Sequence, residues 1–138
     1  MKREDKELLF KDLSARVPYG TKIQAGEFKE TLTDAVKWGE GARVNEHKLE
    51  TIRPYLRSLS SMTEDEEAEA ENLGITWVLR DRFNGLDFTQ EKIFNGFNGT
   101  GTEQMKALDW LNAHHFDYRG LIPMRLAIEV TKENNPYV

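Results

Sequence analysis

Hydrophobic residues near the N-terminus recur with a helical period. Leu9, Leu13 and Val17 follow one another four residues apart, and half of the positions between them are charged. Apolar residues at this spacing share one face of an α-helix. The pattern therefore predicts an amphipathic helix over residues 6–16, capped at its start by Asp5.

The following stretch, residues 20–53, has the pattern of short strands. Threonine, isoleucine, valine and aromatic residues are interrupted there by glycines. The predicted strands cover residues 22–25, 28–32, 35–38, 43–46 and 48–52. Short strands with tight turns favour a curled antiparallel sheet, or a small open barrel. Pro54 lacks an N–H, so we expect it at a sheet edge or beyond the last pairing.

The second half of the chain alternates between helical and strand patterns. Thr63 and Glu66 have the spacing of a capping box, which predicts a short, largely solvated acidic helix. Residues 75–79 read as a strand, and Asn84-Gly85 as the turn of a hairpin pairing 75–83 with 86–90.

A last major helix is predicted over residues 103–115. Thr102 stands at the position of its cap, and Met105, Leu108 and Leu111 share one face. Residues 126–130 fit a short helix or a closing strand. Together these elements predict an α+β protein with a single domain over 1–138. Its N-terminal and C-terminal helices pack on the sheet, and 131–138 form a flexible tail.

Composition narrows the functional classes. Hydrophobic residues make up 38% and charged residues 31% of the 138 residues, and there is no cysteine. Disulfides, thiolate metal sites and cysteine nucleophiles are therefore excluded. No apolar run approaches the roughly 18 residues of a membrane span, and the N-terminus lacks a signal-peptide pattern. We expect a cytoplasmic protein with no membrane partner.

The net charge of −5 is unevenly distributed. Residues 64–71 hold six acids and no base, and the rest of the chain sums to +1. Runs of this kind are usually solvated helix faces, and this one lacks the ligand spacing of a calcium loop. The overall acidity therefore argues only weakly against nucleic-acid binding elsewhere on the surface.

Three segments carry a family resemblance: KDLSARVPYG at 11–20, IRPYLRSLSSMTEDE at 52–66 and WLNAHHFDYRGLI at 110–122. In order and rough spacing they resemble small uncharacterised proteins that are common in Bacteroidetes genomes, often near prophage-like or mobile elements. The third string is the most specific. The resemblance implies a small α+β domain from a mobile-element context. It implies no activity, cofactor or functional residue.

Polar and aromatic groups are densest near the end of the last predicted helix. Six residues there form a candidate interaction or structural site: Trp110, His114, His115, Asp117, Tyr118 and Arg119. Neighbouring helical residues point in different directions, so the two histidines cannot share one ion while both are helical. Histidines in a last helical turn instead complement the helix dipole, which favours a structural role. A metal site of His115 with Asp117 is the chemical alternative.

Basic residues on and after the predicted sheet form a second candidate site. Arg43, Lys48, Arg53 and Arg57, with Trp38 and Tyr55 nearby, define a possible nucleic-acid face. Acidic residues lie among them, so the local excess of positive charge is small.

These observations favour a non-enzymatic accessory or interaction protein of a mobile genetic element. Its partner would be another protein or a second copy of the chain. The alternatives are a nucleic-acid-binding small barrel and, third, a metal-dependent enzyme. No motif predicts a cofactor, a nucleophile with its base, or a phosphate-binding loop.

Overall fold

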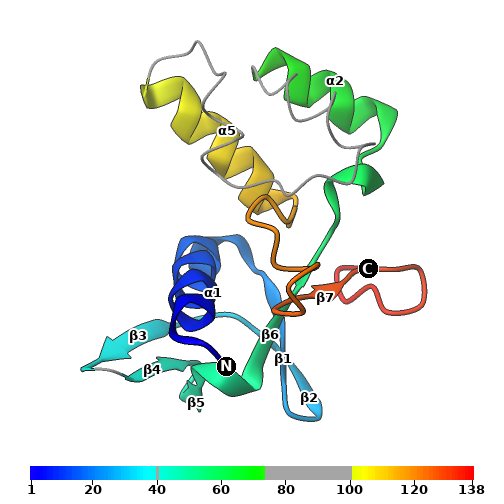
Figure 1. Ribbon diagram of the computed structural model, residues 1–138. Helices are drawn as coiled ribbons and strands as arrows, with labels where there is room; N and C mark the ends of the chain where they lie inside the picture. Colours follow the sequence, from blue (N-terminus) through cyan, green and yellow to red (C-terminus); the bar gives the residue numbers. More distant parts are fainter. Residues whose placement is uncertain (40, 74–100) are drawn as a thin grey trace. The chain divides into compact units, whose positions relative to one another are not determined.

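The computed structural model describes residues 1–39, 41–73 and 101–138 and combines helices with sheets (Figure 1). The α+β class predicted from the sequence is confirmed. The chain divides into two compact units, Met1–Leu56 with Leu121–Val138, and Arg57–Gly120. The strand predicted at 75–79 and the hairpin at Asn84-Gly85 lie outside the described residues.

The first unit begins with helix α1, Arg3–Arg16. The predicted cap at Asp5 is wrong, because the helix starts earlier and Lys2 occupies its N-cap position without a side-chain hydrogen bond. Asp5 instead lies in the first turn, where the helix dipole favours a carboxylate. Leu9 and Leu13 are fully buried, as their four-residue spacing predicted.

A four-stranded sheet has the order β2-β1-β6-β7. Its strands are β1 (Lys22–Ala25), β2 (Phe28–Thr31), β6 (Ile52–Leu56) and β7 (Ile128–Glu129). Strand β1 is antiparallel to β2 and β6, whereas β7 runs parallel to β6. The antiparallel pairing predicted for the strands of residues 20–53 is confirmed, and β7 adds one parallel pair at the end of the sheet. The long connection between β6 and β7 leaves the direction of β7 free, whereas a tight hairpin forces antiparallel pairing.

A separate three-stranded antiparallel sheet contains β3 (Ala35–Trp38), β4 (Gly41–Val44) and β5 (His47–Lys48). The predicted strand 43–46 ends at Val44, because Asn45 and Glu46 take left-handed backbone angles and form the turn into β5. Most of the predicted strand 48–52 is the 3-10 helix η2, Leu49–Thr51. The described strands thus form two sheets and do not close into a barrel.

Pro54 lies inside a central strand, contrary to the expectation of an edge. It is opposite Ile23 of β1, and the pairing with β7 begins only at Tyr55. The Tyr137 hydroxyl bridges the Lys22 N–H and the Tyr55 carbonyl across this ladder. By alternation the next pair, Ile23 with Pro54, is not hydrogen-bonded, so the nitrogen of Pro54 faces away from β1. The missing N–H therefore removes no hydrogen bond from either ladder.

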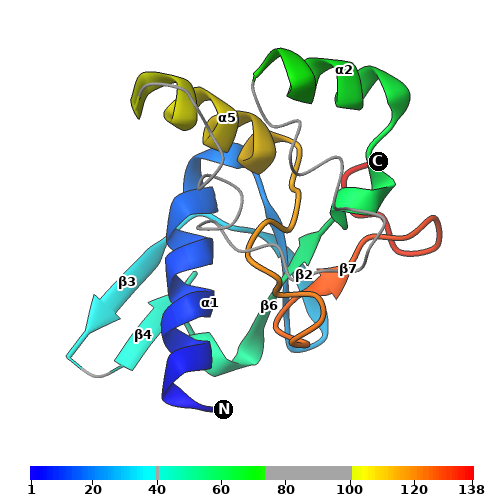
Figure 2. The same cartoon turned by 45° about the horizontal axis from the view of Figure 1, so that its top comes forward.

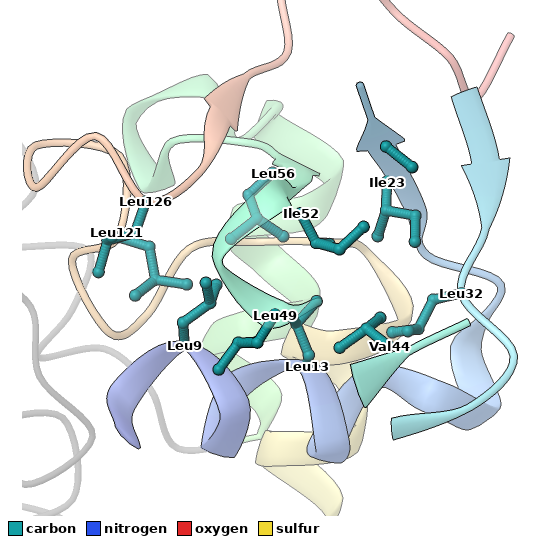
Figure 3. Close-up of a cluster of buried hydrophobic side chains, with 11 residues drawn as sticks. Leu9, Leu13, Ile23, Leu32, Val44, Leu49, Ile52, Leu56, Leu121 and Leu126 are labelled. Carbon is teal, nitrogen blue, oxygen red and sulfur yellow. The ribbon is translucent and has the colours of Figure 1, made fainter. Parts of the chain in front are cut away.

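The core of the first unit lies between α1 and the sheets (Figures 1 and 3). Leu9 and Leu13 of α1 meet side chains from β1, β4, η2 and β6. The C-terminal segment completes this cluster with Leu121 and Leu126. Burial of such side chains contributes roughly 1.5–3 kcal/mol each, which makes this cluster the main source of stability for a short helix and short strands.

The second unit contains the 3-10 helix η3 (Leu59–Ser61) and helices α2 (Glu64–Asn72) and α5 (Gly101–Ala113), which lie side by side in Figures 1 and 2. The capping box at Thr63 and Glu66 is confirmed. The predicted cap at Thr102 is wrong, because Gly101 and Thr102 already belong to α5.

The face that α5 buries agrees with the predicted one except at Met105. Leu111 is fully buried with Ala107 and with Ala70 of α2, and Leu108 packs against them, whereas Met105 is 67% exposed. The small alanine side chains let the helices approach, and the apolar stripe therefore centres on Ala107 in place of Met105.

Candidate functional site

The end of α5 carries an aromatic cluster. Helix α5 ends at Ala113, and His115 turns the chain with a left-handed backbone angle of φ 62°. The rings of Trp110 and His114 are 4.4 Å apart between centroids, and those of Trp110 and Phe116 are 5.6 Å apart. The turn at His115 therefore folds Phe116 back onto the last turn of the helix.

Glu66 of α2 joins this cluster to the start of the unit. Both carboxylate oxygens of Glu66 accept hydrogen bonds from the Arg57 guanidinium, each at 2.7 Å. One oxygen also accepts from the N–H of Thr63 at 2.9 Å, and the other lies 3.1 Å from Nδ1 of His114. The Arg57 guanidinium carbon stacks 4.3 Å from the centre of the Phe116 ring. We call Arg57, Glu66, Trp110, His114 and Phe116 the Glu66 cluster.

The electrostatics of this cluster hold Glu66 in its charged form. Burial raises the pKa of Glu66, but the hydrogen bonds from Arg57 and Thr63 and the charges of Arg57 and His114 outweigh that effect. The result is a pKa of about 2. A carboxylate whose two oxygens are already occupied is a poor general base. The cluster is therefore suited to holding α2 against the end of α5.

Glu69 strengthens the same contact. Its carboxylate accepts a 2.9 Å hydrogen bond from the indole Nε1 of Trp110 and lies 3.9 Å from Nε2 of His114. The two ring nitrogens of His114 thus face two different carboxylates of α2. The sequence pattern does not predict these partners, because a run of acids is usually a solvated helix face. The capping box at Thr63 was the available signal, since it places Glu66 at the helix start.

The remaining predicted site residues follow the turn. The Tyr118 hydroxyl donates to Oδ1 of Asn112 at 2.7 Å and accepts from Arg119 at 3.0 Å, and all three residues are buried. His115 and Asp117 pair through their backbone groups with Arg57, at 2.8 Å each. In residues 1–39, 41–73 and 101–138, no group of three histidines or carboxylates could hold a metal ion.

The four predicted nucleic-acid contacts are divided between different elements. Arg43 and Lys48 lie directly opposite each other on β4 and β5. Arg53 belongs to the other sheet, where it pairs with Gln24 and donates to the carbonyls of Glu50 and Ile52. Arg57 belongs to the second unit and is bound to Glu66. Only Arg43 and Lys48 therefore share one face of a sheet.

A row of side chains on the three-stranded sheet includes these two cations. Val36 of β3 is opposite Arg43, and Arg43 is opposite Lys48, so the three side chains project on the same face. All three are exposed. The opposite face of this sheet carries Lys37 and Ala42, of which Ala42 packs against the core. We call Val36, Arg43 and Lys48 the basic row.

Strand β3 also has an open edge. No described strand pairs with the side of β3 that faces away from β4. The N–H of Asn45 donates to the carbonyl of Asp34 at 3.0 Å, which sets the alternation of the ladder. The backbone groups of Ala35 and Lys37 therefore point away from β4, toward the open edge. Sequence reasoning identified Arg43 and Lys48 but missed this edge.

Comparison with known proteins found no match to a protein-family model, a curated protein or a solved structure. None of the helices in the described part of the chain is both long enough and apolar enough to cross a membrane.

Proposed function

We propose that the protein is a non-enzymatic interaction protein that binds an acidic, extended segment of a partner protein along β3 and the basic row. The observation that carries this proposal is that Arg43 of β4 and Lys48 of β5 lie on the exposed face of a sheet whose edge strand β3 is open. An accessory role in a mobile genetic element, which the sequence resemblance implies, is compatible with such a module. The same proposal treats the Glu66 cluster as structural.

The repulsion between the two cations of the basic row supports binding of an acidic segment. Like charges directly opposite each other on a sheet destabilise it, by up to about 1 kcal/mol. Arg43 reduces this cost only in part, by donating to the carbonyl of Glu46 at 3.0 Å. Arg43 lies one strand inward from β3 and Lys48 two strands inward, so carboxylates reach them from the part of the segment that leaves the edge and crosses this face. There they would convert the repulsion into attraction.

The backbone groups at the open edge of β3 provide the second contribution to binding of the segment. An extended segment can add to an exposed sheet edge through main-chain hydrogen bonds, and its alternate side chains then give specificity. Ala35 and Lys37 offer the outward N–H and C=O groups for such pairing. A partner strand beside β3 would place every second side chain next to Val36, on the face of the basic row.

A second copy of the chain suits this edge less well. Two β3 strands pairing with each other would bring the cations of two basic rows onto one extended sheet. Like charges placed together in this way oppose association. Nucleic acid is the other alternative, but only Arg43 and Lys48 of the four predicted contacts share a face, and phosphate binding usually recruits more cations.

Fluorescence anisotropy with a labelled peptide of alternating glutamate and valine tests the proposal. We expect saturable binding, no binding of a matched lysine–valine peptide, and at least fivefold weaker binding, about 1 kcal/mol, for Lys48→Glu. Lys29→Glu is the matched control, because Lys29 is an exposed strand lysine of the other sheet. Ala35→Pro, which removes an outward N–H, should also weaken binding.

Two results would contradict the proposal. Equal losses for Lys48→Glu and Lys29→Glu would show that only net charge matters. Absence of peptide binding, together with a salt-sensitive mobility shift of DNA or RNA that Lys48→Glu removes, would replace it with the nucleic-acid alternative.

A further inference from the structure

A pocket lies on the opposite side of the same sheet, in the first unit. It has a volume of about 420 Å³ and is lined by α1, the β3–β4 hairpin and η2. Sites for small molecules commonly enclose roughly 300–1,000 Å³. The volume is therefore sufficient for a small organic ligand. Of the lining residues, the proposed function uses only the backbone of Lys37.

The lining combines apolar surface with charged groups. Phe10 of α1, Ala42 of β4 and Leu49 of η2 supply the apolar part. Ala42 lies directly opposite Lys37 in the β3–β4 ladder. Because the alanine side chain is small, the space beside Lys37 is left open.

The charged side chains of the described lining residues do not balance. They are three cations and two carboxylates, namely Arg3, Lys6, Lys37, Glu7 and Glu50. Arg3 pairs with Glu7 and Lys6 pairs with Glu50, each at 3.3 Å. Among the described residues, Lys37 has no carboxylate partner, and its ammonium group lies 6.0 Å from the centre of the Phe10 ring. One positive charge therefore remains beside an aromatic surface.

We propose that this pocket binds a small amphipathic organic anion, such as an acyl or aromatic carboxylate or sulfonate. The apolar part of the ligand packs against Phe10, Ala42 and Leu49, where its removal from water provides most of the affinity. The acidic group pairs with Lys37 at the rim. A neutral ligand would leave the Lys37 ammonium without an opposite charge, and a cation would be repelled by it.

Titration with anilinonaphthalene sulfonate, an aromatic anion that fluoresces in apolar surroundings, tests this assignment on the full chain. We expect saturable binding of one molecule per chain. Lys37→Glu replaces attraction with repulsion and should weaken binding about tenfold. Lys37→Arg should retain it, and Ala42→Leu, which fills the space opposite Lys37, should also weaken it.

Lys29→Glu is the control, because it makes the same charge change on the other sheet and Lys29 does not line the pocket. Octanoate should displace the probe, whereas octanol at the same concentration should displace less. Circular dichroism of each variant separates loss of the site from loss of the fold. Unchanged binding in both Lys37→Glu and Ala42→Leu, or an equal loss in Lys29→Glu, would overturn the proposal. Neither result bears on peptide binding at the basic row.

Discussion

Tyr137 donates a 2.7 Å hydrogen bond from its hydroxyl to the backbone carbonyl of Tyr55. The same hydroxyl accepts a 2.9 Å hydrogen bond from the N–H of Lys22. Lys22 on β1 and Tyr55 on β6 occupy the next position along their ladder after its last pair, Ile23 with Pro54. The phenol therefore takes the place of one direct hydrogen bond between the strands, and it ties the C-terminal segment to both.

Replacing Tyr137 with phenylalanine should destabilise the first unit. The change keeps the ring but leaves the Lys22 N–H and the Tyr55 carbonyl without this shared partner, which costs about 1–3 kcal/mol. Urea unfolding followed by circular dichroism measures the loss. Val138→Ala is the control, since Val138 is fully exposed and should change nothing. Equal stability of Tyr137→Phe and the unaltered protein would show that the bridge contributes little.

The same residue should make stability depend on alkaline pH. Burial raises the pKa of Tyr137 from 10.0 to about 12, against the opposing effects of the Lys22 N–H and the Arg16 charge. The folded state thus favours the neutral phenol, and this contribution is complete below pH 10 and is lost as the pH rises toward 12. The stability difference between the unaltered protein and Tyr137→Phe should shrink over that range. A constant difference would contradict this assignment.

Glu66→Gln tests the Glu66 cluster. Glu66 is only 14% exposed and binds Arg57 through both oxygens, so the neutral amide should destabilise the second unit by about 1–3 kcal/mol at neutral pH. Because the pKa of Glu66 is lowered from 4.5 to about 2, its contribution is present above pH 4.5 and is lost as the pH falls toward 2. Denaturant unfolding at several pH values measures both effects.

Glu64→Gln is the matched control for that experiment. Glu64 is an exposed acid in the first turn of the same helix and should cost at most about 0.5–1 kcal/mol through the helix dipole. If the two substitutions have equal effects at every pH, the contacts of Glu66 with Arg57 and His114 add nothing to stability.

Asn45 should be the most sensitive turn position in the first unit. Its side-chain oxygen accepts from the N–H groups of Thr33 and Asp34, and its amide donates to the carbonyl of Thr31 at 2.7 Å. Its backbone has φ 49°, which alanine tolerates poorly. Asn45→Gly should therefore lose only the hydrogen bonds, and Asn45→Ala should cost about 1 kcal/mol more. Thermal unfolding distinguishes these outcomes, and equal melting temperatures would exclude the strain.

Much of the fold could be predicted from patterns of residues that are close together in the sequence. The four-residue spacing of Leu9 and Leu13 correctly identified α1 and its buried face. The capping box at Thr63 and Glu66 was correct because it depends on residues three apart. The predicted helix starts at Asp5 and Thr102 were less accurate, since a helix can begin at any of several neighbouring residues with little difference in free energy.

Pairing between segments that are far apart in the sequence could not be predicted from local patterns. Nothing near Ile128 indicates that it pairs parallel to β6, and the position of Pro54 in a central strand depends on where β7 begins. The partners of His114 lie 45 and 48 residues earlier, at Glu69 and Glu66. A run of acids is usually solvated, so its charge pattern predicted exposure, and only helix packing brought two of these acids against α5.

The α+β class, the first helix, the capping box and most of the short strands could be predicted from the sequence. Each of these follows from side-chain period and turn chemistry within a few residues. The strand order, the bridge from Tyr137 to Tyr55 and the placement of Arg43 and Arg53 on different sheets depend on the tertiary structure. These features depend on which apolar faces are buried together, and burial brings residues into contact without regard to their distance along the chain.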